Sequence, residues 1–263
     1  MSIPAPSPLT DTTTRIVRMV FPDQTNHHDT LFGGEALSLM ASAASITAAR
    51  RCRNPVVLAG SEAIDFRAPV PHGSIAEVTA RVAAVGRTSV AISVALDAED
   101  LLTGDRVRST EGRFTFVAVD AGGRPVPITH VGDDPPVDDR IPEEPAGDTL
   151  TTTTTERVLP AQVNHLGTLF GGELVRLIDI VAFIAATRHT HTPMVTARFE
   201  QIDLRTPVKL GHLVELHASI VETRRTSLVV GVEVIAEEPV SGERHLCTSG
   251  RVVMAPARPA PPD

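Results

Sequence analysis

The segment NHHDTLFGGE at residues 26–35 decides the fold, because it returns as NHLGTLFGGE at residues 164–173. The register continues without a gap: IDFRAPV at 64–70 aligns with IDLRTPV at 202–208, and RTS at 87–89 with RTS at 225–227. Between residues 21–116 and 159–254, 38 of 96 aligned positions are identical. A repeat of this length is a duplicated domain, because solenoid units have periods of about 20–50 residues. Shared residues are expected to serve the fold, and polar residues present in one copy need a separate reason.

Composition sets the class of protein. The 263 residues suffice for two domains with cores of their own, and the net charge of −8 gives no electrostatic case for nucleic acid. The two cysteines, Cys52 and Cys247, lie in no metal-ligand or CxxC pattern, which favours a reducing cytoplasm. The first residues show no secretory signal, and no apolar run reaches the ~18 residues that span a bilayer. We predict a cytoplasmic protein without membrane insertion.

The composition along the chain predicts five segments. Residues 1–13 form a disordered tail, 14–119 a first domain, 120–149 an acidic linker rich in Pro and Gly, 150–256 a second domain, and 257–263 a tail.

Each domain has the same predicted order of elements. A β-rich entry (15–20; 151–158) leads to the Asn-His loop and then to an apolar run (36–49; 174–187) too long for a strand, which predicts one buried helix. Four strands follow in the first copy, at 56–67, 75–85, 89–97 and 106–119, with equivalents in the second. We therefore predict an α+β fold in which a curved antiparallel sheet wraps one long helix. The two copies are expected to join edge to edge as a pseudo-dimer.

Asp179 is the first candidate for chemistry. It lies in the apolar helix of the second copy, where the first copy has Ala41. A carboxylate in apolar surroundings needs a partner or a task. One alternative is a catalytic acid; the other is an ion pair with Arg176, which the first copy also lacks, having Ser38 there.

The loop before each helix supplies further candidates. Asn26 and Asn164 are either functional groups or local turn residues. The Gly33-Gly34 pair opens a helix whose free N–H groups could form an oxyanion hole, or it makes a tight entry turn. The histidines after each Asn, His27 and His165, are interpreted as hydrogen-bonded loop residues because no Ser or Cys nucleophile is placed beside them.

Other polar groups have simpler interpretations. The helix-start acids Glu35 and Glu173 complement the helix dipole. The His-x-His at 189–191 lacks the acid or Cys spacing of a zinc site, so we predict no metal. The RTS turns are either solvated strand caps or contacts for phosphates and amides, with Arg67 and Arg205 as weaker candidates of the same kind. The turn residues are Arg87, Thr88, Ser89, Arg225, Thr226 and Ser227.

The Asn loop, the Gly-Gly helix start, the single long helix and the Phe/Leu-Arg-x-Pro-Val turn resemble the hotdog fold. The tandem arrangement is similar to the double-hotdog acyl-CoA thioesterases of the cytosolic long-chain acyl-CoA hydrolase type. This resemblance implies that Asn26 acts with Asp179 across the domain interface. The reciprocal pair, Asn164 with Ala41, lacks the acid and implies a degenerate second site. The resemblance also implies contact of the RTS turns with coenzyme A.

The sequence thus predicts an acyl-CoA hydrolase with one competent site, catalytic residues Asn26, Asp179, Gly33 and Gly34, and no cofactor beyond coenzyme A in its substrate and product. Asp179 would be a general base or a nucleophile. The alternatives are a non-catalytic acyl-CoA binding or sensing module and, less favoured, a hotdog hydratase or dehydratase. The expected partners are acyl-CoA and further copies of the chain, for example in a trimer of pseudo-dimers.

Overall fold

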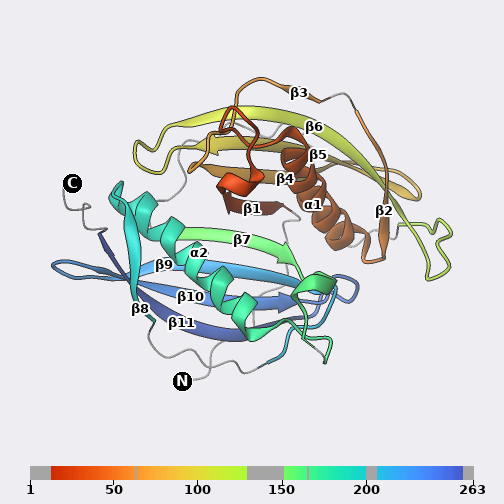
Figure 1. The fold of residues 1–263 in the computed structure, drawn as a ribbon. Coiled ribbons are helices and arrows are strands. Elements are labelled where there is room, and N and C mark those ends of the chain that lie inside the picture. The colour runs from red at the N-terminus through yellow and green to blue at the C-terminus, as the bar shows by residue number, and fades with distance from the viewer. Residues whose placement is uncertain (1–12, 63, 129–150, 165, 200–205, 257–263) are drawn as a thin grey trace. The chain divides into compact units, whose positions relative to one another are not determined.

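The structure, a computed structural model, describes residues 13–62, 64–128, 151–164, 166–199 and 206–256. These residues form two compact units (Figure 1). The first contains the sheet and helix of the first repeat together with residues 237–244. The second contains the sheet and helix of the second repeat together with residues 100–105. The turn between the last two strands of each repeat is therefore grouped with the other repeat's unit.

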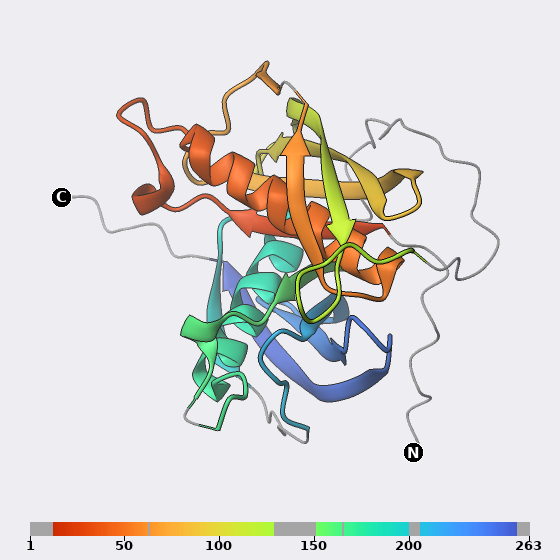
Figure 2. The ribbon, with the colours of Figure 1, turned by 90° about the vertical axis from the view of Figure 1, so that its right-hand side faces the viewer.

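The first unit has one long helix and an antiparallel sheet with the strand order β1-β4-β5-β6-β2, to which β3 is added beside β6 (Figure 2). Its elements are β1 (Thr14–Met19), the short helix η1 (Pro22–Gln24), α1 (Gly33–Cys52), β2 (Val56–Ser61), β3 (Asp65–Phe66), β4 (Ile75–Val85), β5 (Ser89–Glu99) and β6 (Arg106–Ala118).

The second unit repeats this design, with the strand order β7-β9-β10-β11-β8. Its elements are β7 (Thr151–Arg157), η2 (Pro160–Gln162), α2 (Gly171–Thr190), β8 (Met194–Phe199), β9 (Leu213–Thr223), β10 (Leu228–Glu237) and β11 (Arg244–Pro256). The predicted α+β class, with one long helix and one antiparallel sheet per copy, is confirmed.

The two long helices begin three residues before their apolar runs, at Gly33 and Gly171, and end at residues in the left-handed conformation, Arg53 and His191. The prediction of a helix buried all round is correct for the C-terminal half of α1, where residues 46–52 are all buried. It is wrong for the first three turns. Within the unit, the face of α1 that carries Leu37 and Ser38 is exposed, since the sheet covers the opposite face.

The predicted strand 56–67 is two strands in the structure. β2 pairs with β6 through a bulge between Leu58 and Gly60, and the amide of Glu62 donates to the carbonyl of Arg113 before the ladder stops. Pairing resumes only where Asp65 and Phe66 meet Glu111 and Thr110. An extra residue in one strand bends that strand and twists it away from its neighbour, which ends a ladder that continuous β propensity would extend.

A buried ion pair lies inside the first unit. The guanidinium of Arg50 donates from Nε and Nη2 to the carboxylate of Glu237, with Nη2 2.9 Å from Oε2, and both side chains are almost fully buried. Arg53 approaches the same carboxylate at 3.6 Å. Glu237 is thus neutralised by residues that precede it in the chain by more than 180 positions.

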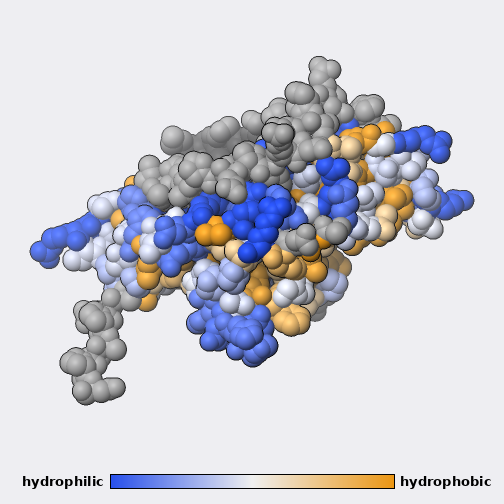
Figure 3. All heavy atoms as spheres, turned by 90° about the horizontal axis from the view of Figure 1, so that it is seen from above, coloured by the Kyte–Doolittle hydropathy of each residue, from blue (hydrophilic) through white to orange (hydrophobic). Residues whose placement is uncertain are grey.

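The edge strand β2 is largely exposed, with apolar Val57 and Leu58 about half accessible. On the face drawn in Figure 3, hydrophobic side chains reach the surface at several separate places between hydrophilic ones.

In the described parts of the chain, neither long helix has the length and apolar character that crossing a membrane demands.

Candidate active site

The Asn26 loop folds as a side-chain-closed turn. Asn26 Oδ1 accepts from the amide of His28 at 2.8 Å, and Nδ2 donates to Thr30 Oγ1 at 3.0 Å. The backbone closes the same loop, because the amides of Asn26 and Asp29 bond to Thr30 and Asn26 carbonyls. Asp29 adopts a positive φ of 54°, where the second repeat has Gly167 at 71°. Asn26 therefore closes a local turn, and its catalytic role stays a prediction.

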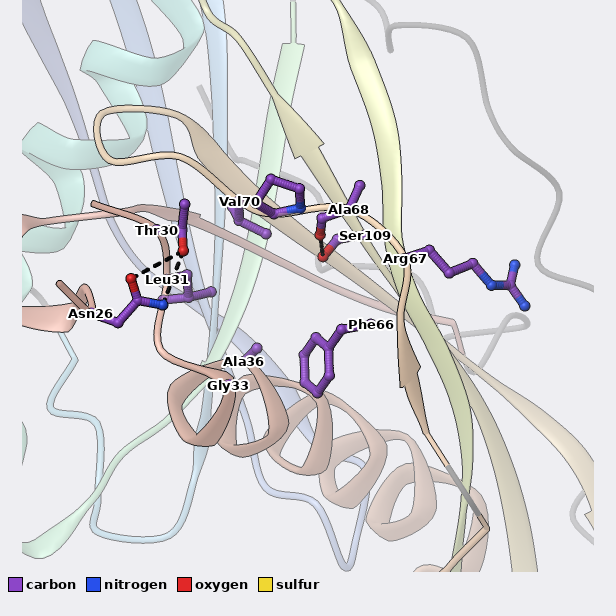
Figure 4. A pocket seen from close by; sticks show the side chains of 11 residues that line it. Asn26, Thr30, Leu31, Gly33, Ala36, Phe66, Arg67, Ala68, Val70 and Ser109 are labelled. Carbon is purple, nitrogen blue, oxygen red and sulfur yellow. Dashed lines mark hydrogen bonds between the residues drawn. The ribbon is translucent and has the colours of Figure 1, made fainter. Parts of the chain in front are cut away.

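Asn26 also lines a pocket of about 310 Å³ in the first unit. The walls are the loop, the start of α1 and the segment from Phe66 to Val70, with Ser109 of β6 behind (Figure 4). Asn26 and Thr30 lie on one side, and the ring of Phe66 points toward the start of α1 from the other. The Ser109 hydroxyl donates to the carbonyl of Ala68 at 2.6 Å and fixes the far wall. The pocket thus combines apolar side chains with several polar groups, some of them fixed by hydrogen bonds.

The two glycines of the helix start have different surroundings. A Cβ on Gly34 would lie 3.2 Å from the ring of Phe32, a tight contact with an exposed side chain that would have to move slightly. A Cβ on Gly33 would meet the Phe66 ring at 3.7 Å, an ordinary contact. Gly33 lines the pocket, and the first amides of a helix have no helical acceptor. Gly33 is therefore the better placed of the two for an oxyanion hole, which stays a prediction for both.

Asp179 lies half-buried on α2 in the second unit. Its Oδ1 accepts a hydrogen bond from Thr196 Oγ1 at 2.5 Å. The alternative of an ion pair with Arg176 is wrong, because that guanidinium bonds to Glu173, with Nη2 3.0 Å from Oε2. Arg176 and Glu173 are one turn apart on the exposed side of the helix. Among the described residues Asp179 has no cationic partner, and its one bond comes from a neutral hydroxyl.

Thr196 was missed by the sequence reasoning. It lies on β8, opposite Met254 of β11, and its hydroxyl reaches across to the helix. The signal was present, because the first repeat has Leu58 at the aligned position and Ala41 where Asp179 stands. The acid and its hydrogen-bond donor are therefore absent together from the first repeat, as expected if they act as a unit.

The second repeat has the same Asn loop. In the predicted degenerate site this loop would act with helix α1, which has Ala41 in place of the acid. Asn164 Oδ1 accepts from the amides of Leu166 and Thr168, at 2.9 and 3.3 Å. This turn repeats the geometry of Asn26, but the aligned helix position, Ala41, offers no polar group. The assignment of Asn164 and Ala41 to a degenerate site stays a prediction. His165 and Arg205 lie outside the described residues.

The RTS triplets form two-residue hairpin turns. The amide of Gly86 donates to the carbonyl of Ser89, and that of Arg224 to Ser227. Both central arginines, Arg87 and Arg225, are exposed. Ser89 pairs with Val117, at the opposite end of β6 from the pocket residue Ser109 and so about 26 Å from it. Arg87 therefore does not reach the pocket of its own unit, and contact of these turns with coenzyme A stays a prediction.

The remaining histidines and cysteines of the described residues have simple local surroundings. The exposed rings of His27 and His28 are in contact, with centroids 3.8 Å apart and planes tilted by 45°. Among the described residues the His27 ring makes this contact rather than the hydrogen bond that the sequence suggested. Burial raises the pKa of both cysteine thiols, Cys52 and Cys247, to about 11. Within the described ranges, no three His, Cys, Asp or Glu side chains converge as metal ligands would.

Comparison with known proteins agrees with this architecture. The chain belongs to the thioesterase superfamily, which matches residues 28–104 and again residues 166–243. It is 35% identical to an acyl-CoA hydrolase from Agrobacterium tumefaciens, whose crystal structure matches with a TM-score of 0.78 over 93% of this chain and 95% of that one. The predicted tandem hotdog fold is thereby confirmed.

Two curated relatives match slightly less than half of the chain each. The uncharacterized acyl-CoA thioester hydrolase YkhA of Bacillus subtilis is 40% identical over 112 residues, which are 43% of this chain and 65% of that protein. The cytosolic acyl coenzyme A thioester hydrolase of Rattus norvegicus is 28% identical over 127 residues, 48% of this chain and 33% of that protein. The chain therefore spans between a third and two thirds of the length of these relatives.

Proposed function

We propose that the protein is an acyl-CoA thioesterase, which hydrolyses an acyl-CoA to a free fatty acid and coenzyme A. The observation that carries this proposal is the half-buried Asp179 carboxylate, oriented by Thr196 and neutralised by no cation of the described chain. The names of the superfamily and of the matched relatives support the same reaction.

In the proposed reaction the thioester carbonyl binds at the start of α1, where the Gly33 amide stabilises the charge that develops on its oxygen. Asn26 orients the carbonyl or the attacking water. Its Nδ2 group makes one hydrogen bond, to Thr30, so one N–H remains for a ligand among the contacts of the described residues. Asp179 removes the proton of the water as general base, and its direct attack to form an anhydride is the variant mechanism.

The proposal is tested by release of coenzyme A from a panel of C2–C18 acyl-CoAs. Asp179→Asn keeps the size of the side chain and removes the base, so we expect activity to fall by about 10²–10⁴-fold. Asn164→Ala is the matched control, because it disrupts the same turn in the second repeat, which is predicted to act with Ala41 instead of an acid. This variant should keep most of the activity. A wild-type protein that binds acyl-CoA without releasing coenzyme A would be a binding module instead.

We further propose a cytoplasmic location and a homo-oligomer, for example a trimer of pseudo-dimers. The reduced, buried cysteines and the name of the rat relative support the first. The half-exposed apolar residues of edge strand β2 support the second. Light scattering coupled to size-exclusion chromatography measures the mass, and a monomeric mass would exclude the assembly.

A further inference from the structure

Four alternating charges cross the sheet of the first unit beside the pocket. Arg108 Nε bonds to Asp97 Oδ1 at 2.5 Å, and Arg108 Nη1 lies 3.5 Å from Glu111 Oε2. The other oxygen of Glu111 then accepts from Arg67 Nη2 at 2.6 Å. Exposure rises along this ladder, from 6% and 13% at Arg108 and Asp97 to 47% and 59% at Glu111 and Arg67.

The second repeat lacks the ladder. At the positions of Asp97, Arg108 and Glu111 it has residues that carry no charge, namely Ile235, Leu246 and Ser249. The fold therefore forms without these charges. Exposed ion pairs contribute little to stability, and a partly buried one loses much of its attraction to desolvation. Stability alone is a weak reason for the first repeat to keep the ladder.

The ladder ends at the rim of the pocket. Phe66 and Arg67 are neighbours on the same segment, so their side chains leave it in opposite directions, and Figure 4 shows Phe66 pointing to the helix start and Arg67 pointing away from it. The backbone holds the segment independently, since the Arg67 amide donates to the carbonyl of Ser109 at 2.7 Å. Glu111 uses one of the five N–H donors of Arg67, and the rest face solvent without another partner among the described residues.

We infer that Arg67, held by Glu111, binds a phosphate of the substrate's coenzyme A portion while the thioester occupies the pocket. This inference rests on the proposed function and adds a specificity-determining residue to it. A guanidinium fixed at one corner presents its remaining donors in the fork geometry that suits phosphate oxygens. The thioester end would then be bound at the pocket and the charged end by Arg67.

The test compares the binding of coenzyme A and of pantetheine, which lacks the phosphates, by calorimetry on the full-length protein. We expect Arg67→Met to weaken coenzyme A binding about tenfold or more and to leave pantetheine binding unchanged. Arg67→Lys keeps the charge but lacks the forked guanidinium, so its affinity for coenzyme A should lie between those of the wild type and of Arg67→Met. Arg113→Met is the matched control, because Arg113 lies on β6, pairs with exposed Glu62 at 3.8 Å, and should bind coenzyme A as wild type does.

Equal weakening for both ligands, or unchanged coenzyme A binding in Arg67→Met, would overturn the inference. So would a wild type that binds coenzyme A no more tightly than pantetheine. Circular dichroism verifies that the variants are folded. Because the readout is binding, a protein that binds coenzyme A through Arg67 but hydrolyses no acyl-CoA would refute the proposed thioesterase and leave this inference standing.

Discussion

The hydroxyl of Thr196 donates to the carboxylate of Asp179, with 2.5 Å between Oγ1 and Oδ1, and joins edge strand β8 to helix α2. The bond fixes which carboxylate oxygen stays free to accept a proton. In the first repeat the two aligned residues are Leu58 and Ala41, so neither half of the pair was kept without the other. We interpret Thr196 as a positioning residue for the acid.

Thr196→Val replaces the hydroxyl by a methyl group of similar size. We expect kcat for acyl-CoA to fall about 10–100-fold, because a hydrogen bond to a charged group contributes about 1.5–3 kcal/mol. KM should change little, since Thr196 acts through Asp179. Steady-state kinetics separate the two parameters, and Thr196→Ser should restore kcat. A variant that loses stability but keeps kcat would show a purely structural role.

The two helix-start glycines give a paired experiment. Gly33→Ala should leave the melting temperature near the wild-type value, because the new methyl group meets only the Phe66 ring at 3.7 Å, and should lower kcat by obstructing the substrate at the amide. Gly34→Ala should also leave the melting temperature near the wild-type value, because the exposed Phe32 ring 3.2 Å from its Cβ can move, and it should lower kcat less, because Gly34 does not line the pocket. The opposite order of the two rates would contradict our assignment of Gly33 to the oxyanion hole.

The Arg50–Glu237 ion pair predicts a large stability effect without a catalytic one. Glu237→Gln removes the carboxylate charge from this buried ion pair, which costs about 3–5 kcal/mol of unfolding free energy. Urea titration followed by circular dichroism measures the loss. Glu62→Gln removes a charge whose side chain is 67% exposed and should leave the unfolding curve unchanged. Equal curves for the two variants would refute the importance of the buried pair.

Both cysteines should resist alkylation in the native protein. Burial raises the pKa of Cys52 and of Cys247 to about 11, so that at pH 8 little of either thiol is the reactive thiolate. The nearby charge of Arg51 lowers the pKa of Cys52 but less than burial raises it. Iodoacetamide at pH 8 should label both only in denaturant, as counted by mass spectrometry. Rapid labelling of the folded protein would contradict the assigned burial.

The fold could be predicted largely because the chain contains it twice. The agreement of two diverged copies fixed the helices and most strands, and the 3.6-residue pattern separated helix from sheet. The break within 56–67 could not be foreseen, because the bulge at Leu58–Gly60 depends on pairing with β6 and leaves no local mark beyond one glycine.

The site was predicted in parts. Asn26, Gly33 and the isolated Asp179 follow from the sequence, since helix starts and lone charges in apolar runs are local signals. The partner of Asp179 is not local. Arg176 is three residues away and was the natural candidate, whereas Thr196 comes from a strand whose register only the folded sheet defines. Sequence proximity therefore favoured the wrong ion pair.

Glu237 belongs to the second repeat, yet it supplies the buried counter-charge of Arg50 in the first unit. A first half expressed alone would lack Glu237 together with the rest of the 237–244 turn, and would therefore lose the buried ion pair with Arg50. Because both repeats belong to one polypeptide, they are always made in equal amounts, and every molecule contains both Arg50 and Glu237.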